Sequence, residues 1–231
     1  MKQPRIIETE DLIKDYAMGK QFFRALSDIN LSINKGEFCG LVGPSGSGKT
    51  TLLNIIGALD NPTGGNAKVM ERNINTLRHK EAANLRNESI GFIFQTYNLL
   101  PVYTVFENVE FPLILLKKNK HEREEAVMQA LEWVGLSNKA QSKPKQLSGG
   151  ESQRVAVARA MVKLPKIVLA DEPTANLDAA NSHNIIKTMQ KLNLELNTTF
   201  VFATHDEKVI KYLRRKVVLN DGKIVDDLNI N

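Results

Sequence analysis

Nine consecutive residues have the composition and spacing of a phosphate-binding loop. They read Gly43-Pro44-Ser45-Gly46-Ser47-Gly48-Lys49-Thr50-Thr51, with two glycines five positions apart and then lysine and threonine. The backbone N–H groups of such a loop, together with the N-terminus of a following helix, bind anions. We therefore expect Lys49 to reach the outer phosphates of a nucleotide and the Thr50 hydroxyl to bind Mg²⁺.

The segments on either side of this loop must form a strand and a helix if the motif is to bind phosphate. Residues 38–42 form a short apolar run with strand character, and Leu52, Leu53, Ile55 and Ile56 have helical spacing. A surface turn rich in glycine and serine is the alternative interpretation. The order strand, glycine-rich turn, helix favours the phosphate loop.

Two adjacent carboxylates provide a second group of candidate catalytic residues. Asp171 and Glu172 end the apolar run at residues 167–170. An acid at the carboxyl end of a buried strand beside a phosphate loop can hold Mg²⁺. The next carboxylate can activate a water molecule as a general base. The alternative interpretation is that both acids are merely solvated at the end of a strand. The phosphate loop upstream makes this alternative the weaker interpretation.

Polar residues also follow two other apolar segments. Gln95 comes after residues 90–94, and His205 comes shortly after residues 199–203. Ligands of open α/β sheets gather at the carboxyl ends of the strands, so His205 should lie on the same edge as the phosphate loop. Gln95 is of interest only because of its place in such a fold.

Two further features have weaker local signals. Ser148 precedes Gly149 and Gly150 at the start of a small-residue helix, where it is a plausible N-cap and the glycines leave the helix start open to an anion. Tyr16 lies 27 positions before Gly43 and could stack on a purine. Packing of Tyr16 on its own sheet is equally compatible with its position.

Composition and charge limit the class of protein. The chain has 231 residues, of which 42% are hydrophobic and 25% charged, with a net charge of +5. These values are ordinary for one globular domain, and the charge does not by itself indicate nucleic acid. Cys39 is the only cysteine, which excludes an internal disulfide.

We find neither a transmembrane run nor a leader pattern in the sequence. We therefore expect a cytoplasmic protein whose membrane span, if needed, belongs to another chain.

The periodicity of the remaining chain predicts an α/β domain with a helical insertion. Residues 1–36 have β character, residues 77–86 and 122–135 have helical spacing, and a hairpin with an Asp-Gly turn spans residues 217–225. A further helix is expected over residues 179–196.

Taken in order, these motifs resemble those of ABC-type ATPases, the nucleotide-binding subunits of ABC transporters. The resemblance covers nearly the whole chain. Residues 53–60, 90–95, 97–101 and 107–109 resemble the lipoprotein-releasing (LolD) and macrolide-export (MacB) branch. Glu151 and Ser152 stand where many members have glutamines, and acidic variants at the first position are familiar. The implied fold is a P-loop NTPase core with a mixed sheet in residues 1–95 and 161–231, including an antiparallel β region, and an α-helical subdomain in residues 96–160.

The resemblance also implies roles for individual residues. Tyr16 would stack on adenine, Gln95 would touch Mg²⁺ or the attacking water, and His205 would contact the γ-phosphate. The segment Ser148-Gly149-Gly150 would act on ATP held by another protomer, in a homodimer or in a heterodimer with a related cassette. The dimer would dock on a transmembrane permease at the inner face of the membrane and drive export or extraction of a lipoprotein, macrolide or peptide-like substrate.

Two other functions share the same motifs. One is a mechanical ATPase of the cell-division type that signals across the membrane. The other is a soluble ABC-type ATPase acting on DNA or ribosomes. Chromosome-maintenance members carry a long coiled coil between the two motifs, whereas Lys49 and Ser148 lie only 99 positions apart. Ribosome-acting members usually carry two cassettes in one chain, and this chain has one. We therefore expect no nucleic-acid partner.

Overall fold

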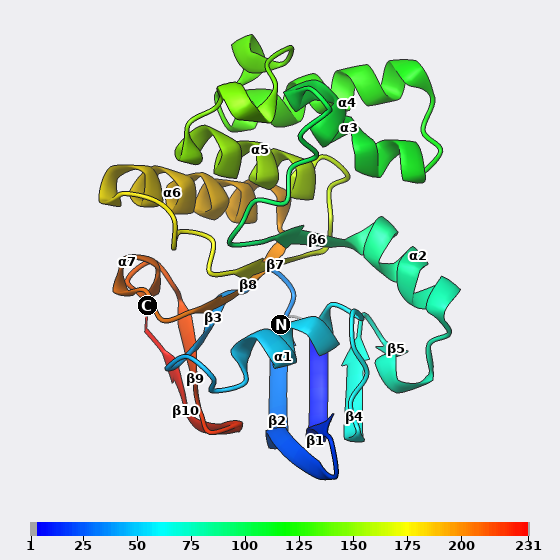
Figure 1. Ribbon diagram of the computed structural model, residues 1–231, viewed down its shortest axis with the longest axis vertical. Coiled ribbons are helices and arrows are strands. Elements are labelled where there is room, and N and C mark those ends of the chain that lie inside the picture. Colours follow the sequence, from blue (N-terminus) through cyan, green and yellow to red (C-terminus); the bar gives the residue numbers. More distant parts are fainter. Residues whose placement is uncertain (1–3, 231) are drawn as a thin grey trace.

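The computed structural model describes residues 4–230, which form two sheets and seven α-helices within that range (Figure 1). Residues 1–3, where the prediction of no leader peptide partly falls, and residue 231 lie outside the described part. None of the described helices combines the length and the apolar character needed to cross a bilayer.

A six-stranded sheet positions the phosphate loop, the two adjacent acids, Gln95 and His205. Its order is β10-β9-β3-β8-β7-β6, in which neighbouring strands are parallel except for the antiparallel edge strand β10. The carboxyl ends of the parallel strands therefore lie along one edge of the sheet, as expected for a site in an open α/β fold. The strands are β3 (Phe38–Val42), β6 (Ile90–Ile93), β7 (Ile167–Asp171), β8 (Thr199–Thr204), β9 (Arg215–Asn220) and β10 (Lys223–Asn229).

A second sheet is antiparallel and has the order β2-β1-β4-β5. Its strands are β1 (Arg5–Met18), β2 (Gln21–Asn34), β4 (Gly64–Val69) and β5 (Arg72–Asn73). The predicted N-terminal β region is thus confirmed, and together with the mixed six-stranded sheet it confirms the predicted fold class. Strand β4 begins inside a stretch whose Asn-Pro and Gly-Gly pairs predict only a turn.

Seven helices cover and separate the sheets. They are α1 (Lys49–Ile56), α2 (His79–Ser89), α3 (Val105–Leu115), α4 (Lys120–Trp133), α5 (Gly149–Met161), α6 (Ala179–Leu196) and α7 (Glu207–Ile210). Helix α1 lies between the two sheets, and α3, α4 and α5 gather at one end of the molecule (Figure 1). The helices expected at residues 122–135 and 179–196 are confirmed within two residues at each end.

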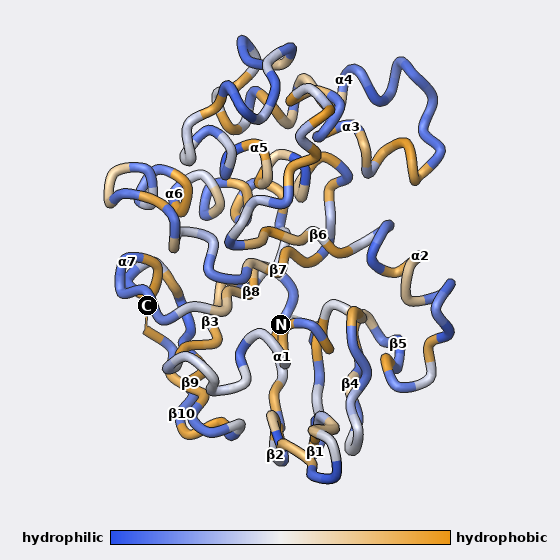
Figure 2. The backbone as a smooth tube through the Cα atoms, in the orientation of Figure 1, coloured by the Kyte–Doolittle hydropathy of each residue, from blue (hydrophilic) through white to orange (hydrophobic). Residues whose placement is uncertain are grey.

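Two apolar cores fix the sheet edge that carries the site. The alternating side chains of β8 divide between them: Phe200 and Phe202 face the helices α3 to α6, whereas Val201 and Ala203 face α1 and the antiparallel sheet. In Figure 2 hydrophobic residues, in orange, are concentrated in strands such as β6 and also in helices such as α3. All five residues of β8 from Phe200 to Thr204 are fully buried, so the strand end is held firmly.

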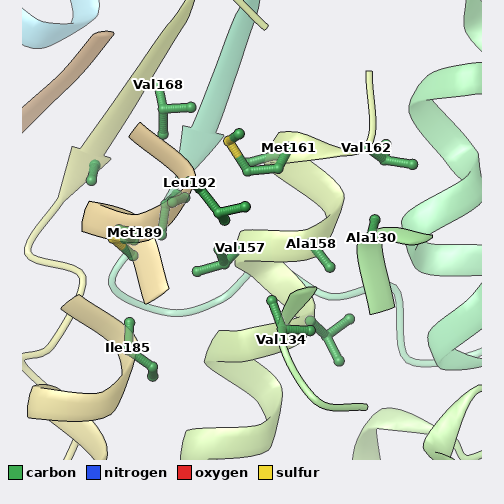
Figure 3. Packing of buried hydrophobic residues seen from close by; sticks show 14 of the residues in the cluster. Ala130, Val134, Val157, Ala158, Met161, Val162, Val168, Ile185, Met189 and Leu192 are labelled. Atoms are coloured by element: carbon green, nitrogen blue, oxygen red, sulfur yellow. The ribbon is translucent and has the colours of Figure 1, made fainter. Parts of the chain in front are cut away.

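Helix α5 is packed on two sides, which matters because the Ser-Gly-Gly segment lies at its start. Figure 3 shows Val157 and Met161 of α5 on the side of α6, where they belong to the same core as Ile185 and Met189. On the other side Ala158 lies toward the end of α4. This packing orients the N-terminus of α5 relative to the sheet.

Candidate functional site

The phosphate loop joins β3 to α1, as the sequence predicts. Gly48, the N-cap of α1, has a φ of 98° and gives no side-chain cap, so the first N–H groups of the helix remain available to a ligand. A Cβ at Gly48 would lie 2.7 Å from the backbone oxygen of Ala25. Both the left-handed backbone and this close approach require glycine.

Two polar side chains, those of Lys49 and Ser47, are buried inside this loop. The Lys49 ammonium donates to the backbone oxygens of Gly43 and Pro44, at 2.8 Å each, and burial lowers the pKa of Lys49. The Ser47 hydroxyl is buried and has no hydrogen-bond partner among the described residues. A buried hydroxyl without a hydrogen-bond partner is costly in free energy. An oxygen of a phosphate bound in the loop would supply that partner.

Asp171 lies next to the phosphate loop at the end of β7. The Thr50 hydroxyl donates to Asp171 Oδ1 at 3.1 Å, and burial raises the pKa of Asp171. A bound cation would offset this burial of the carboxylate. Hydroxyl and carboxylate oxygens are the donors that Mg²⁺ prefers, so this pair fits a magnesium ion.

Glu172 is held by two groups from the end of β8. Its Oε1 lies 2.6 Å from His205 Nδ1, and its Oε2 accepts a hydrogen bond of 3.0 Å from the Thr204 hydroxyl. The Glu172 backbone has a φ of 44°, a left-handed conformation that few residues other than glycine, asparagine and aspartate adopt readily. The carboxylate is therefore fixed in orientation before any ligand binds. Thr204 was not identified from the sequence, because a buried threonine in a strand has no distinctive pattern.

A cavity of about 500 Å³ brings most of the predicted site residues together. Its size suits a small-molecule ligand. The predicted residues in its lining are Tyr16, Ser45, Gly46, Ser47, Gly48, Lys49, Thr50, Thr51, Gln95, Asp171, Glu172 and His205. Gly43 and Pro44 do not line the cavity and instead hold Lys49. Phe23, Ala25 and Ala175 also line the cavity, although no local sequence pattern distinguishes them.

Tyr16 lies in the lining of this cavity with a fixed orientation. Its hydroxyl donates to Asp60 Oδ2 at 3.0 Å, and the Lys14 ammonium lies 4.9 Å from the centre of its ring. The side chain remains 37% exposed. Its ring is thus positioned by polar contacts and keeps surface for a ligand.

The loop that carries Gln95 is anchored to two other segments. The Gln95 backbone oxygen accepts from the Asn176 side chain at 2.9 Å. Tyr97 and Asn98 both have positive φ angles, and their backbone oxygens accept from the Arg159 guanidinium at 2.6 Å each. Arg159 thereby ties this loop to α5, a contact between distant segments that local sequence patterns do not reveal.

The Ser-Gly-Gly segment starts α5 but does not line the cavity of its own chain. The predicted N-cap is confirmed: Ser148 Oγ accepts from the Glu151 N–H at 3.2 Å, and the Glu151 carboxylate accepts from the Ser148 N–H at 2.8 Å. A Cβ at Gly150 would lie 2.5 Å from the Asn181 side chain. Gly150 therefore packs closely against the start of α6, whereas Ser148 and Gly149 are exposed.

Comparison with known proteins agrees with this geometry. A family model described as ABC transporter matches residues 26–175. The lipoprotein-releasing system ATP-binding protein LolD of Legionella pneumophila is 42% identical over 219 residues, which cover 95% of this chain and 96% of that protein. The ABC transporter ATP-binding protein YvrO of Bacillus subtilis is 45% identical over 222 residues, or 96% of each chain.

A solved structure is similar over nearly the same length. It is the dimeric, post-hydrolysis state of the ATP-binding cassette MJ0796 bound to ADP and Pi, a protein of Methanocaldococcus jannaschii. The two chains are 41% identical, the match covers 97% of this chain and 99% of that one, and the TM-score is 0.90. Sequence family, fold and site geometry agree, and the chain belongs to the ABC transporter family as an ATP-binding cassette that hydrolyses ATP.

Proposed function

We propose that the cavity binds ATP together with Mg²⁺ and that Glu172 activates the attacking water. The observation that carries this proposal is the juxtaposition of Lys49, the Thr50–Asp171 pair and the Glu172–His205 pair along one sheet edge. Mg²⁺ held by Thr50, Asp171 and Gln95 would neutralise charge on the phosphates.

Glu172 and the residues around it have different roles in hydrolysis. The Glu172 carboxylate accepts a proton from water as the water attacks the terminal phosphorus. His205 and Thr204 hold that carboxylate in place, and His205 in addition contacts the γ-phosphate. Lys49 and the N–H groups of the loop stabilise the negative charge that develops on the departing ADP.

We also propose that two copies of the chain enclose the nucleotides. Ser148, Gly149 and Gly150 lie outside the cavity of their own chain but start a helix whose N–H groups can bind an anion. In a two-fold dimer each copy would offer this segment to the ATP of its partner, and the contacts would be reciprocal. The dimeric structure of MJ0796 supports this arrangement.

Ser148→Arg is expected to separate nucleotide binding from dimer formation. The exposed Ser148 lies away from its own cavity, so the monomer should bind ATP within about twofold of wild type. Both this variant and its control carry Glu172→Gln, so that hydrolysis does not separate the copies. The bulky cation should block the partner's approach and leave a single-copy mass at saturating ATP. Ser137→Arg, at another exposed serine, serves as the control and should dimerise normally. A normal dimer of the Ser148→Arg protein, measured by light scattering, would rule out the role in trans.

A second surface suits the membrane subunit of a transporter. A groove of about 480 Å³ runs between α2, β6 and α3. Leu59, Phe111 and Leu115 line it and are 48%, 38% and 54% exposed. Arg159 and Asn98 also line this groove, so it is continuous with the loop that carries Gln95.

We propose that a short cytoplasmic segment of a separate transmembrane subunit occupies this groove and senses the nucleotide through Gln95. The cassette would then work at the inner face of the membrane. It would drive export or extraction of a lipoprotein, macrolide or peptide-like substrate that it does not itself touch. The similarity to LolD supports extraction or export over mechanical signalling.

Leu115→Glu is expected to weaken capture of the membrane subunit at least tenfold, because a carboxylate would be buried in an apolar contact. The ATPase rate of the isolated cassette should not change. Leu194→Glu is the matched control, since Leu194 is 69% exposed and does not line the groove. The measurement is copurification of the membrane subunit that is found with the wild-type cassette and identified by sequencing. Equal capture by both variants would place the docking surface elsewhere.

A further inference from the structure

We propose that Phe23 forms, together with Tyr16, an aromatic cleft that receives the purine ring of the nucleotide. This inference rests on the proposed function, since it assigns a base-binding residue to the same cavity. Phe23 and Tyr16 both line the cavity that contains the phosphate loop. Phe23 has no other role in the site described above.

The register of β1 and β2 places the two rings on one face of the sheet. Tyr16 and Phe23 are directly opposed across this antiparallel pair, and opposed residues project to the same side. The neighbouring pair, Asp15 and Arg24, projects to the other side, where the guanidinium donates to both carboxylate oxygens at 2.8 and 3.0 Å. Because side chains alternate between the two faces of the hairpin, Tyr16 and Phe23 lie together on the face toward the cavity.

Tyr16 has only one ring face free for stacking. The other face lies under the Lys14 ammonium, and Lys14 is itself 7% exposed and tied to Asp60 and the Asn61 backbone oxygen at 2.6 and 2.7 Å. Because Asp60 also binds the Tyr16 hydroxyl, the ring cannot turn easily. A base that stacks on Tyr16 must therefore use the face away from Lys14.

Phe23 remains 52% exposed although it lines a cavity. A flat ligand against its ring would remove apolar surface from water and add a second aromatic contact. Ala25, two residues further along β2, also lines the cavity, and its backbone oxygen lies close to Gly48. Strand β2 thus runs from the aromatic pair to the phosphate-binding backbone.

Phe22 provides a matched control. It is 76% exposed, it lies opposite Ala17 in the same hairpin, and it does not line the cavity. Both phenylalanines are exposed, so alanine at either position should leave the fold intact.

The experiment compares ADP with pyrophosphate, which has no base, by isothermal titration calorimetry on the full chain with Mg²⁺. ADP is chosen so that closure of a dimer does not contribute. Phe23→Ala should raise the Kd for ADP about tenfold, as expected for one lost base–aromatic stack, and leave the Kd for pyrophosphate unchanged. Phe23→Tyr should keep wild-type affinity for ADP, and Phe22→Ala should change neither Kd by more than about twofold.

The outcomes separate this inference from the proposed function. If Phe23→Ala and Phe22→Ala bind ADP equally well, or if Phe23→Ala weakens ADP and pyrophosphate alike, Phe23 does not contact the base. If the wild-type chain binds neither ligand, the nucleotide site itself is wrongly assigned. A stable fold of each variant is checked by its thermal unfolding midpoint.

Discussion

The Glu172→Gln protein is expected to bind ATP as tightly as the wild-type cassette and to hydrolyse it about 10² to 10⁴ times more slowly. The side-chain amide can still accept the hydrogen bond that Thr204 donates to Glu172, so the local structure should persist. The amide cannot accept a proton from water near neutral pH, however. The chemical step should therefore fail while nucleotide binding remains.

This prediction is checked by steady-state ATPase rates and by equilibrium ATP binding on the same preparations. Glu207→Gln is the control, because Glu207 is an exposed carboxylate at the start of α7 near the same sheet edge. It should retain the wild-type rate. A Glu172→Gln protein that hydrolyses ATP at the wild-type rate would show that another group is the general base.

The second large effect is expected for Lys49→Ala, which should weaken ATP binding about a hundredfold or more. The substitution removes the cation that we assign to the phosphates. It also removes the two hydrogen bonds to the Gly43 and Pro44 oxygens that hold the loop. A hydrogen bond to a charged group contributes about 1.5–3 kcal/mol, and about 2.7 kcal/mol corresponds to a hundredfold change in affinity.

Calorimetric titration with ATP and Mg²⁺ measures this loss directly. Lys187→Ala, at an exposed lysine of α6, controls for the loss of one positive charge and should bind normally. The thermal unfolding midpoint is measured for both variants, to show that each is folded at the temperature of the titration. If the Lys49→Ala protein bound ATP with unchanged affinity, the assignment of residues 43–51 as the phosphate-binding loop would be wrong.

The parts of the fold that sequence patterns predicted are those with short-range signals. The glycine spacing of residues 43–51 and the acids that end β7 could be recognised because each depends on neighbours in the chain. The N-cap at Ser148 could be recognised for the same reason. Strand β4 could not, because its Gly-Gly start is typical of a turn and only pairing with β1 makes it a strand.

The missed site residues depend on contacts between distant segments. Thr204 orients Glu172 only because β8 lies beside β7. Phe23 reaches the cavity because of the register of a long hairpin whose pairing contains several irregularities. Arg159 holds the loop after Gln95 across 61 positions of sequence. No local pattern distinguishes these residues from ordinary strand and helix residues.

The helical segment between residues 96 and 160 was predicted in outline and not in detail. Helix α4 was expected because Val127, Ala130, Leu131 and Val134 have helical spacing. Helix α3 was not resolved as a separate element: it contains Pro112 and is apolar over most of its surface, so it shows little periodicity. Its exposed apolar residues, among them Phe111 and Leu115, line the groove that we assign to the membrane subunit.

The central claim is that ATP joins two copies of this cassette and that hydrolysis lets them separate. Light scattering on the Glu172→Gln protein, at micromolar concentration with and without ATP and Mg²⁺, tests it most directly. We predict a mass near the 25.8 kDa of one chain without nucleotide and twice that mass at saturating ATP, with ADP unable to replace ATP. A mass that stays at one chain under saturating ATP, with binding verified on the same sample, would contradict the account.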